Sequence, residues 1–370
     1  MYEKFKILVA PLDWGLGHTT RCIPVIKELM KQGAAVITAG TDAQKAVLKA
    51  EFPGISSLHL DGYNVKYSST RQGLSVKMLQ QMPGIYTSIK KEHAWLKQVI
   101  AGYNINGVIS DNRFGLFTDI VPAVFITHQL HIKSSLSGLI DGVVQKLNYR
   151  KIEKYSACWI PDFEKGATLA GVLSHPSKPP AIPCHYIGPL SRNAIQDPGM
   201  VKGHLLFIIS GPEPQRTIWE EKVFAQAHGY KGTVTIVRGL PGNDGVQVLK
   251  NGKVYNHLPA AEMNGEMSKA AYIICRSGYS SVMDINAIKK KAILIPTPGQ
   301  PEQEYLAAHL MKNNFAVSCS QEAFDLSGML KKAAAFSYNG FINPENDLLS
   351  AAVHKFLQDC EKQGTRNPVK

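Results

Sequence analysis

Short apolar runs alternate with amphipathic helical stretches along the chain, and loops that contain Gly, Ser or Pro separate them. The first such unit has a strand at 5–10, a Gly-containing turn, a helix at 19–33 and a second strand at 34–40. Strand, helix and strand at this spacing predict a parallel βαβ unit. Because the strands are continuously apolar, we expect helices to cover the sheet on both faces.

A proline-rich segment at 176–198 interrupts this alternation, which then starts again. We place the domain linker at 188–198, within that segment. Strands are expected at 107–111, 123–127, 204–210, 233–239, 253–256, 270–278 and 292–298, with later helices at 215–228, 280–291 and 302–314. The sequence therefore predicts an α/β protein with two Rossmann-like, doubly wound domains, in which ligands bind beyond the carboxyl ends of the strands.

Length, charge and cysteine usage narrow the class further. The 370 residues suit two domains, and 41 Lys and Arg against 29 Asp and Glu give a net charge of +12, which favours an anionic partner. The basic residues are dispersed, so we expect no nucleic-acid partner, and a diffusely basic surface is the simpler alternative to a specific anion site.

There is no apolar run of about 20 residues, and the N-terminus is too short and too charged for a signal peptide. Six cysteines without a C-x-x-C pair indicate reduced, mostly buried thiols in a cytoplasmic protein.

The loop at 13–21, DWGLGHTTR, follows the first strand and opens a helix. Gly15 and Gly17 let the backbone approach a ligand, and the start of the helix favours an anion. Thr20 stands where a dinucleotide fingerprint has its third glycine, so a tight βα turn is an alternative explanation of this loop.

Three loops in the second half also lie between a strand and a helix: SGPEPQR at 210–216, RSGYSSVMD at 276–284 and PTPGQPEQEY at 296–305. Two prolines remove amide donors from the first of these loops, so Arg216 would supply its positive charge. Free amides at the Ser-Gly turn of the second suit a pyrophosphate, although Ser281 and Asp284 could instead form a capping box. In the third, Gln303 and Glu304 match vicinal sugar hydroxyls, or they are solvated residues of a first helical turn.

The stretch AAYIICRSGYSSVMDINAIKKKAILIPTPGQPEQEYLAAHLMKNNFAV resembles the C-terminal domain of glycosyltransferase family 28. The resemblance covers the loops of that domain in order, over about 255–318. The loop at 13–21 is similar, more loosely, to the family's Gly-rich loop that ends in Gly-His. The resemblance implies the GT-B fold, with two Rossmann-like domains facing each other across a cleft. We expect an acceptor-binding domain at 1–190, a nucleotide-sugar donor-binding domain at 191–355, and a helix or tail at 356–370 that can return to the first domain.

The resemblance also implies roles for individual residues. Donor contacts are expected from Ser210, Gly211, Arg216, Arg276, Ser277, Gly278, Tyr279, Ser280, Asp284, Gln303 and Glu304. Ser277 and Gly278 would meet the donor diphosphate, and Asp284 stands where the family has a ribose-binding Glu. Gln303 and Glu304 stand where the family has two glutamines that read the donor sugar, so position 304 carries a charge in place of an amide. The loop at 210–216 is Gly-rich in the family but not in this chain.

Sugar transfer needs a base for the acceptor hydroxyl and stabilisation of the leaving diphosphate. The candidates for the base are His18, Asp13 and Asp111, each just after a strand of the first domain. Histidine titrates most readily near neutral pH, although His18 could serve as a hydrogen-bond donor instead and Asp111 could form an Asx turn.

Acceptor contacts are expected from Gly15, Gly17, His128 and Gln129, although the last two could simply make loop hydrogen bonds. The chain has no D-x-D motif, so we expect no metal and no cofactor, with helix N-termini and Arg216 or Arg276 stabilising the diphosphate.

These features predict a glycosyltransferase that moves a sugar from a UDP-sugar such as UDP-N-acetylglucosamine to an acceptor hydroxyl. Inversion is expected because the family inverts. One alternative is a nucleotide-sugar 2-epimerase, which shares this fold type and consumes the donor without an acceptor. A second is a non-catalytic protein that binds a nucleotide sugar or an anionic lipid.

Residues 63–100 combine basic and apolar side chains with few strand signals. The segment carries Lys66, Arg71, Lys77, Lys90, Lys91 and Lys97, together with Met78, Leu79, Met82, Ile85, Tyr86 and Trp95. One interpretation is an ordinary pair of surface helices. The other is a basic and apolar surface for an amphiphilic acceptor, lipid-linked or saccharide, or for peripheral contact with the inner face of the plasma membrane.

Overall fold

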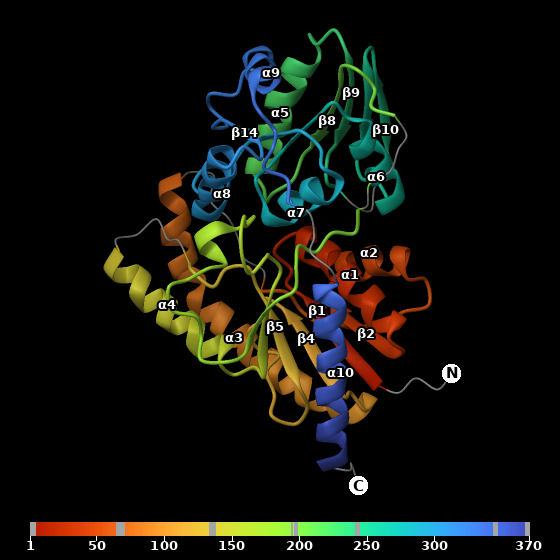
Figure 1. Cartoon of the computed structure of the whole chain (residues 1–370), viewed down its shortest axis with the longest axis vertical. Helices are drawn as coiled ribbons and strands as arrows, with labels where there is room; N and C mark the ends of the chain where they lie inside the picture. Colours follow the sequence, from red (N-terminus) through yellow and green to blue (C-terminus); the bar gives the residue numbers. More distant parts are fainter. Residues whose placement is uncertain are drawn as a thin grey trace. The chain divides into compact units, whose positions relative to one another are not determined.

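The structure is a computed structural model that describes residues 5–63, 71–132, 138–193, 195, 199–240, 245–342 and 347–366 (Figure 1). Within helices, the side chains of 71–79, 138–141 and 365–366 lie outside this description. The chain divides into two compact units. The first comprises Met1–Val65, Met78–Leu190 and Pro344–Lys370, and the second comprises Lys66–Lys77 and Ser191–Asn343.

The first unit is built on a seven-stranded parallel sheet with the order β3-β2-β1-β4-β5-β6-β7. Its strands are β1 (Phe5–Pro11), β2 (Ala34–Gly40), β3 (Ser56–His59), β4 (Gly107–Asp111), β5 (Ala123–Ile126), β6 (Ala157–Ile160) and β7 (Cys184–Tyr186). The central strands are buried along most of their length. This is the pattern expected of a parallel sheet covered on both faces.

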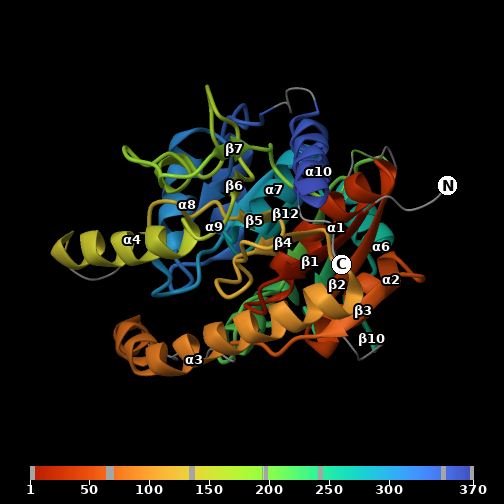
Figure 2. The same ribbon diagram turned by 90° about the horizontal axis from the view of Figure 1, so that it is seen from below.

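Helices cover both faces of this sheet. Figure 2 shows α1 (Leu16–Lys31) and α10 (Leu348–Arg366) on one side and α3 (Arg71–Tyr103) on the other. The remaining helices are α2 (Asp42–Glu51), α4 (Gly138–Ile152) and the 3₁₀ turn η1 (Gly171–Leu173).

The C-terminal helix α10 belongs to the first unit although the second unit precedes it in the sequence. Its buried residues Val353, Phe356, Leu357 and Cys360 recur at helical spacing and form one apolar face. The ring of Phe356 meets Trp159 of β6 edge-on at 5.9 Å. A side chain at Gly107 would come within 2.6 Å of Phe356 and 2.8 Å of Cys360, so the helix packs directly against β4.

The second unit repeats the plan with the strand order β10-β11-β9-β8-β12-β13-β14. Its strands are β8 (His204–Ile208), β9 (Thr233–Val237), β10 (Val246–Leu249), β11 (Gly252–Tyr255), β12 (Tyr272–Cys275), β13 (Ala292–Leu294) and β14 (Val317–Ser318). All pairings are parallel except the β10–β11 hairpin at one edge. The helices are α5 (Gln215–Ala227), α6 (Ala260–Lys269), α7 (Tyr279–Ile288), α8 (Pro301–Lys312) and α9 (Leu326–Ala335).

Two sheets with helices on their faces confirm the predicted fold class, two Rossmann-like domains. Some predicted boundaries are wrong. The strand expected at 270–278 ends at Cys275, and the helix expected at 280–291 ends at Ile288 because Lys289 adopts a left-handed backbone with φ of 52°. The segment predicted as helical stretches within 63–100 is one helix, α3, that continues through Pro83.

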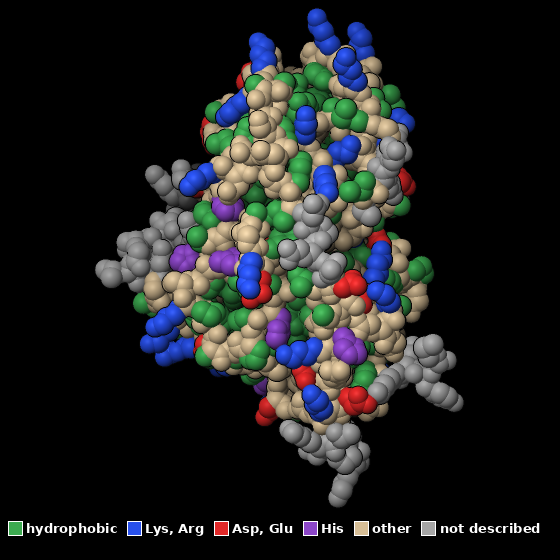
Figure 3. Space-filling view, viewed as in Figure 1, with side chains coloured by type: hydrophobic (Ala, Val, Ile, Leu, Met, Phe, Trp, Pro, Cys, Tyr) green, Lys and Arg blue, Asp and Glu red, His purple; other side chains and the backbone are tan. Residues whose placement is uncertain are grey.

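Part of the predictions falls outside the described residues. These are Lys66, the side chains of Arg71, Lys77, Met78 and Leu79, linker residues 194 and 196–198, and tail residues 367–370. Among the helices that the structure describes, none combines the length and the hydropathy that a bilayer-spanning segment needs. On the face shown in Figure 3, Lys and Arg side chains are spread over much of the surface.

Candidate active site

The loop after β1 places the start of α1 beside the end of β4. Gly15 has a φ of 88°, a backbone conformation that residues with a Cβ rarely adopt, and it precedes the first helical residue without a side-chain cap. The neighbouring Asp13 anchors the loop, because its Oδ1 accepts a hydrogen bond of 3.0 Å from the backbone N–H of Tyr63. Asp13 is therefore engaged in holding the loop in place.

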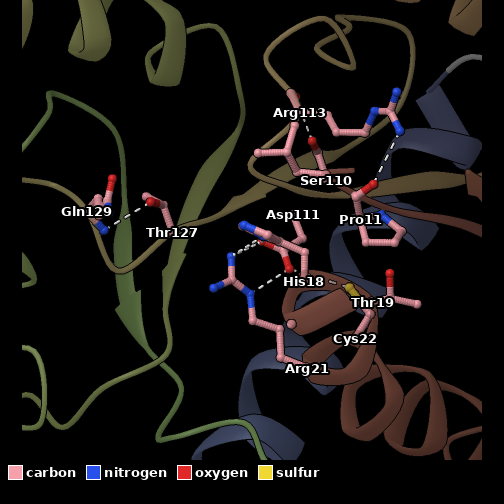
Figure 4. A network of polar contacts seen from close by, with 12 residues as sticks. Pro11, His18, Thr19, Arg21, Cys22, Ser110, Asp111, Arg113, Thr127 and Gln129 are labelled. Carbon is pink, nitrogen blue, oxygen red and sulfur yellow. Dashed lines mark hydrogen bonds and ion pairs between the residues drawn. The ribbon is translucent and has the colours of Figure 1, made fainter. Parts of the chain in front are cut away.

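Three side chains from the first two turns of α1 converge on Asp111, the last residue of β4 (Figure 4). They are His18, Arg21 and Cys22, whose spacing of three and four residues puts them on one helix face. Asp111 receives a hydrogen bond of 2.6 Å from Nε of Arg21 to Oδ2 and a second from Nη2 to Oδ1. His18 Nδ1 lies 3.2 Å from Oδ1, and the Cys22 thiol lies 3.7 Å from Oδ2.

This cluster is nearly closed to solvent. The side chains of Asp111 and Arg21 are 0% and 3% exposed, whereas that of His18 retains 15%. Burial opposes ionisation of Asp111, but Arg21 and His18 outweigh it and hold the pKa of the carboxyl well below its usual range. Burial and the neighbouring Arg21 charge lower the pKa of His18, while Asp111 partly offsets them. At neutral pH the cluster therefore holds a carboxylate, a guanidinium and a neutral imidazole.

Two groups compete for Nδ1 of His18. Nη2 of Arg21 lies 2.8 Å from it, and Oδ1 of Asp111 lies 3.2 Å from it. A guanidinium only donates, so a hydrogen bond from Arg21 leaves the ring proton on Nε2. A hydrogen bond donated by Nδ1 to Asp111 instead leaves the Nε2 lone pair free to accept a proton. The choice between these tautomers decides whether His18 acts as a donor or as a base.

Residues after β5 lie near the same cluster. His128 is 4% exposed, and its charge contributes to lowering the pKa of His18, so the two rings are close. The backbone N–H of Gln129 donates to Oγ1 of Thr127 at 3.0 Å, which shapes this turn (Figure 4). The structure thus brings His18, Asp111 and His128 together at the carboxyl ends of neighbouring strands.

In the second unit, β8, β12 and β13 are parallel neighbours, so the loops that follow them emerge at one edge of the sheet. The turn Arg276–Gly278 leads into α7, whose N-cap is Gly278 without a side-chain hydrogen bond. The capping box considered for Ser281 and Asp284 is wrong, because the helix begins two residues before Ser281. Ser277 is buried and donates its hydroxyl to the carbonyl oxygen of Gln303 at 2.8 Å, which joins two of the loops.

Both candidate arginines are committed to contacts within this unit. Arg216 donates to Glu213 at 2.5 Å and to Glu220, so its charge is balanced by two carboxylates. Arg276 is 2% exposed and donates to the carbonyl of Gln215 at 3.0 Å and to Oε1 of Gln321 at 2.6 Å. Burial lowers the pKa of Arg276 to about 10, so the guanidinium stays charged at neutral pH. Arg276 therefore adds positive charge behind the turn at 276–278, with its donors directed to loop oxygens.

The other candidates order the loops around this edge. Gly211 has a φ of 111°, and a side chain there would lie 3.8 Å from Oγ1 of Thr297, so the loop after β8 approaches the loop after β13. Gln303 accepts a hydrogen bond of 2.9 Å from the backbone N–H of Thr297. Glu304 accepts one of 3.1 Å from the backbone N–H of Gly299. These two side chains fix the turn at 297–300 at the start of α8.

Asp284 lies on α7 beside a cavity of about 100 Å³ in the second unit. The cavity is lined by Arg192, Ile208, Met263, Met267, Cys275, Ser281, Asp284 and Ile285. Oγ of Ser191 donates to Asp284 at 2.6 Å. Burial raises the pKa of Asp284 to about 6, although Ser191, Arg192 and Asn193 favour its charged form. The carboxyl group thus has a pKa just below neutral pH, in a small pocket that both polar and apolar side chains line.

The known proteins that this chain resembles are glycosyltransferases. Residues 220–339 match the model of the glycosyltransferase family 28 C-terminal domain. The chain is also 22% identical, over 334 residues and 85% of both lengths, to the UDP-N-acetylglucosamine–N-acetylmuramyl-(pentapeptide) pyrophosphoryl-undecaprenol N-acetylglucosamine transferase of Buchnera aphidicola subsp. Schizaphis graminum. The chain is a glycosyltransferase, and its residues 220–339 resemble the C-terminal domain of family 28.

Solved structures agree with this assignment at the level of the fold. The glycosyltransferase has a TM-score of 0.60 to the spinosyn rhamnosyltransferase SpnG, at 12% identity and with 99% and 100% of the two chains covered. It has a TM-score of 0.56 to MurG of Acinetobacter baumannii, at 12% identity and with 96% and 99% covered. The resemblance inferred from the sequence is confirmed, and the fold is of the GT-B type.

Sequence reasoning about this glycosyltransferase missed the residue that organises the cluster, Arg21. Arg21 lies three residues after His18 on a helix that follows a strand. That spacing places both side chains on one helix face and could have indicated their contact. It also missed Arg113, which is fully buried and donates to Glu92 at 2.6 Å and to the Pro11 carbonyl at 3.2 Å. Arg113 thus links the end of β1 to α3. No local sequence pattern predicts this long-range contact. The described residues contain no group of three His, Cys, Asp or Glu side chains placed to hold a metal ion.

The electrostatics of the cluster can be measured by NMR titration of the His18 ring protons. We expect the pKa of His18 to lie below about 6.5, the ordinary value for histidine. Arg21→Gln should raise that pKa because it removes a neighbouring positive charge, and Asp111→Asn should lower it further because it removes the negative one.

The wild type, titrated under the same conditions, is the reference for both variants. Circular dichroism checks that each variant folds. An unchanged pKa of His18 in folded Arg21→Gln would contradict the proposed charge coupling.

Proposed function

We propose that this glycosyltransferase moves a sugar from a UDP-sugar, such as UDP-N-acetylglucosamine, to an acceptor hydroxyl with inversion and without a metal or cofactor. The observation that carries the proposal is the His18–Asp111–Arg21 cluster at the start of α1. It combines a partly exposed neutral imidazole with a buried carboxylate that stays ionised. This pairing is what a general base for a hydroxyl group requires.

In the proposed reaction, Nδ1–H of His18 donates to Asp111, and Nε2 accepts the proton of the acceptor hydroxyl. The acceptor oxygen then forms its bond to the anomeric carbon of the sugar as the bond from that carbon to the diphosphate breaks. The negative charge of Asp111 stabilises the imidazolium that forms on His18, whereas the positive charge of Arg21 destabilises it. Release of the proton to solvent would regenerate the base. Asp111 is fully buried, so we assign it the orienting role rather than that of the base.

The leaving diphosphate would be stabilised by the second unit. Its uncapped helix start at Gly278 provides backbone N–H groups and a positive dipole end, and Arg276 adds a buried positive charge behind the turn. Because Arg216 is already balanced by Glu213 and Glu220, we propose that it supports the loop rather than the phosphates. SpnG, which shares the fold, is known in a complex with thymidine diphosphate, at a TM-score of 0.59 and 12% identity.

The role of His18 has a direct test in its replacement by alanine. We expect His18→Ala to lower the turnover number for sugar transfer by about 100-fold or more while donor affinity stays the same, because a general base contributes to the rate and not to donor binding. Turnover would be followed as release of UDP from UDP-N-acetylglucosamine with a panel of saccharide and lipid-linked acceptors. The exposed His354→Ala is the matched control and should keep full activity.

The same assay separates the alternatives. Consumption of the nucleotide sugar without any acceptor would identify a 2-epimerase. Donor binding without turnover on any acceptor would identify a non-catalytic binding protein. Full activity of His18→Ala would exclude His18 as the base and return the role to Asp13.

We propose that Asp284 accepts hydrogen bonds from the ribose hydroxyls of the donor. Its carboxyl group is protonated below a pKa of about 6, so the affinity for UDP should increase as the pH rises through that value and then level off. Asp284→Asn should bind UDP at least about tenfold more weakly, because hydrogen bonds to a charged group contribute more than those to a neutral one. It should also lose this pH dependence.

Isothermal titration calorimetry between about pH 5 and pH 8 measures both effects, because this range spans the pKa of about 6 of Asp284. Glu262→Gln, an exposed carboxylate on α6, is the control. Unchanged affinity in Asp284→Asn would leave Asp284 with its structural contact to Ser191 alone.

We further propose that α3 and α4 form a surface for a lipid-linked acceptor and for the inner face of the plasma membrane. Met82 and Tyr86 of α3 are 51% and 54% exposed, and Val143 and Leu147 of α4 are 61% and 46% exposed. Lys90 and Lys151 lie 4.7 and 5.7 Å from the ring of Tyr86, one from each helix, so the two helices meet there.

The charge of this surface favours an anionic lipid. Lys91, Lys146 and Arg150 are exposed beside the apolar residues. Among the described side chains of the two helices, the one acidic residue is Glu92, which is buried against Arg113. Exposed apolar residues flanked by lysine and arginine are typical of an interfacial membrane contact.

Vesicle sedimentation tests this surface. We expect binding to vesicles of phosphatidylglycerol and phosphatidylcholine that weakens with salt, because cationic side chains then lose their attraction to the anionic lipid. Val143→Asp with Leu147→Asp should reduce binding at least about tenfold, since the apolar contact is lost and like charges repel. Val246→Asp with Val248→Asp on β10, which are 57% and 75% exposed in the wild type, is the matched control. Equal binding to pure phosphatidylcholine would contradict the proposal.

A further inference from the structure

Two cysteines face each other across neighbouring strands of the first unit. Cys158 of β6 and Cys184 of β7 are direct partners in the register of the sheet. Adjacent strands lie about 4.7–4.9 Å apart, which falls within the range of about 4.4–6.8 Å between Cα atoms that a disulfide spans. Paired residues project from the same face of a sheet, and the two thiols are hydrogen-bonded to each other.

The two thiols differ in their surroundings. Cys158 is fully buried in the core of the first unit. Cys184 is partly exposed on β7, the last strand in the sheet order, and its thiol also donates to the carbonyl of Ile182 at 3.4 Å. Solvent can therefore reach Cys184, whereas Cys158 is closed to solvent.

The same asymmetry holds for thiolate formation. The hydrogen bond from Cys158 lowers the pKa of Cys184, while that bond and burial raise the pKa of Cys158. Burial raises the pKa of the other thiols, to about 12 for Cys275 and Cys360 and about 11 for Cys319. A thiolate is the reactive form of cysteine, so Cys184 is the most reactive of these groups.

We propose that Cys184 and Cys158 form a peroxide-reactive dithiol, with Cys184 as the attacking residue and Cys158 as the resolving residue. In the first step, the Cys184 sulfur attacks a peroxide oxygen, the O–O bond breaks, and Cys184 becomes a sulfenic acid. For hydrogen peroxide, the other oxygen leaves as water. In the second step, the Cys158 sulfur attacks the Cys184 sulfur and a second water leaves. Two thiols and one peroxide thus give one disulfide and two waters.

The product would join β7 covalently to the core of the sheet. Only three residues of β7 pair with β6, and the chain then runs through Ile187 to Leu190, the end of this segment of the first unit. Tyr149 of α4 lies close to both thiols, since their charges contribute to raising its pKa. A bond between residues 158 and 184 would therefore restrain the edge strand beneath α4.

Mass spectrometry on the full chain tests the proposal. After brief treatment with hydrogen peroxide, the wild type should become about 2 Da lighter, the mass of two hydrogens, and peptide mapping should find Cys158 joined to Cys184. A thiol reductant should restore the original mass. The oxidised form should also melt at a higher temperature, because the cross-link constrains the unfolded chain.

Single variants separate the two roles. Cys158→Ser should stop at the sulfenic acid on Cys184, which dimedone traps. Cys184→Ser should leave Cys158 unmodified under the same treatment, and Cys319→Ser is the matched control that should still form the disulfide. Persistence of both thiols in the wild type, or oxidation of Cys319 before Cys184, would overturn the proposal. None of these readouts depends on sugar transfer, so the result is independent of the proposed function.

Discussion

The buried carboxylate of Asp111 organises the first unit at the edge where its parallel strands end. It ends β4, lies in register with Pro11 at the end of β1, and receives two hydrogen bonds from Arg21 on α1. A buried charge without a partner is strongly destabilising, so the position of α1 and the ionisation of Asp111 depend on each other. Arg21 also lowers the pKa of His18. One ion pair therefore sets both the geometry of the histidine and its neutral state.

The second unit handles charge differently. Its basic side chains near the loop edge are turned to protein oxygens, with Arg216 on two carboxylates and Arg276 on a backbone carbonyl and an amide oxygen. In the proposed reaction, recognition of the anion falls to the start of α7, where Gly278 provides no side-chain cap. Backbone amides fixed by a sheet and a helix are already oriented before a ligand binds, which reduces the reorganisation that binding requires.

The parts of this architecture that are local in sequence were predictable. Continuous apolar strands and Gly-containing turns predicted both sheets, and the positions after strands pointed to His18, Asp111 and the turn at 276–278. Contacts between distant residues were not predictable. The pairing of Arg21 with Asp111 spans 90 residues, and Asp284 meets Ser191 across 93 residues. The single long helix α3 was missed because Pro83 favours an interruption, and its packing against the sheet overrides that preference.

The return of α10 to the first unit has a consequence for how the chain can be divided. The second unit contains one long contiguous segment, Ser191–Asn343, whereas the first unit is assembled from pieces on either side of it. Removal of the last segment would strip Phe356 and Cys360 from Gly107 and Trp159 and leave an apolar face open to water. During synthesis, the first unit thus stays incomplete until α10, which follows the whole second unit in the sequence, has been made. Its final packing step therefore comes after the second unit has been synthesised.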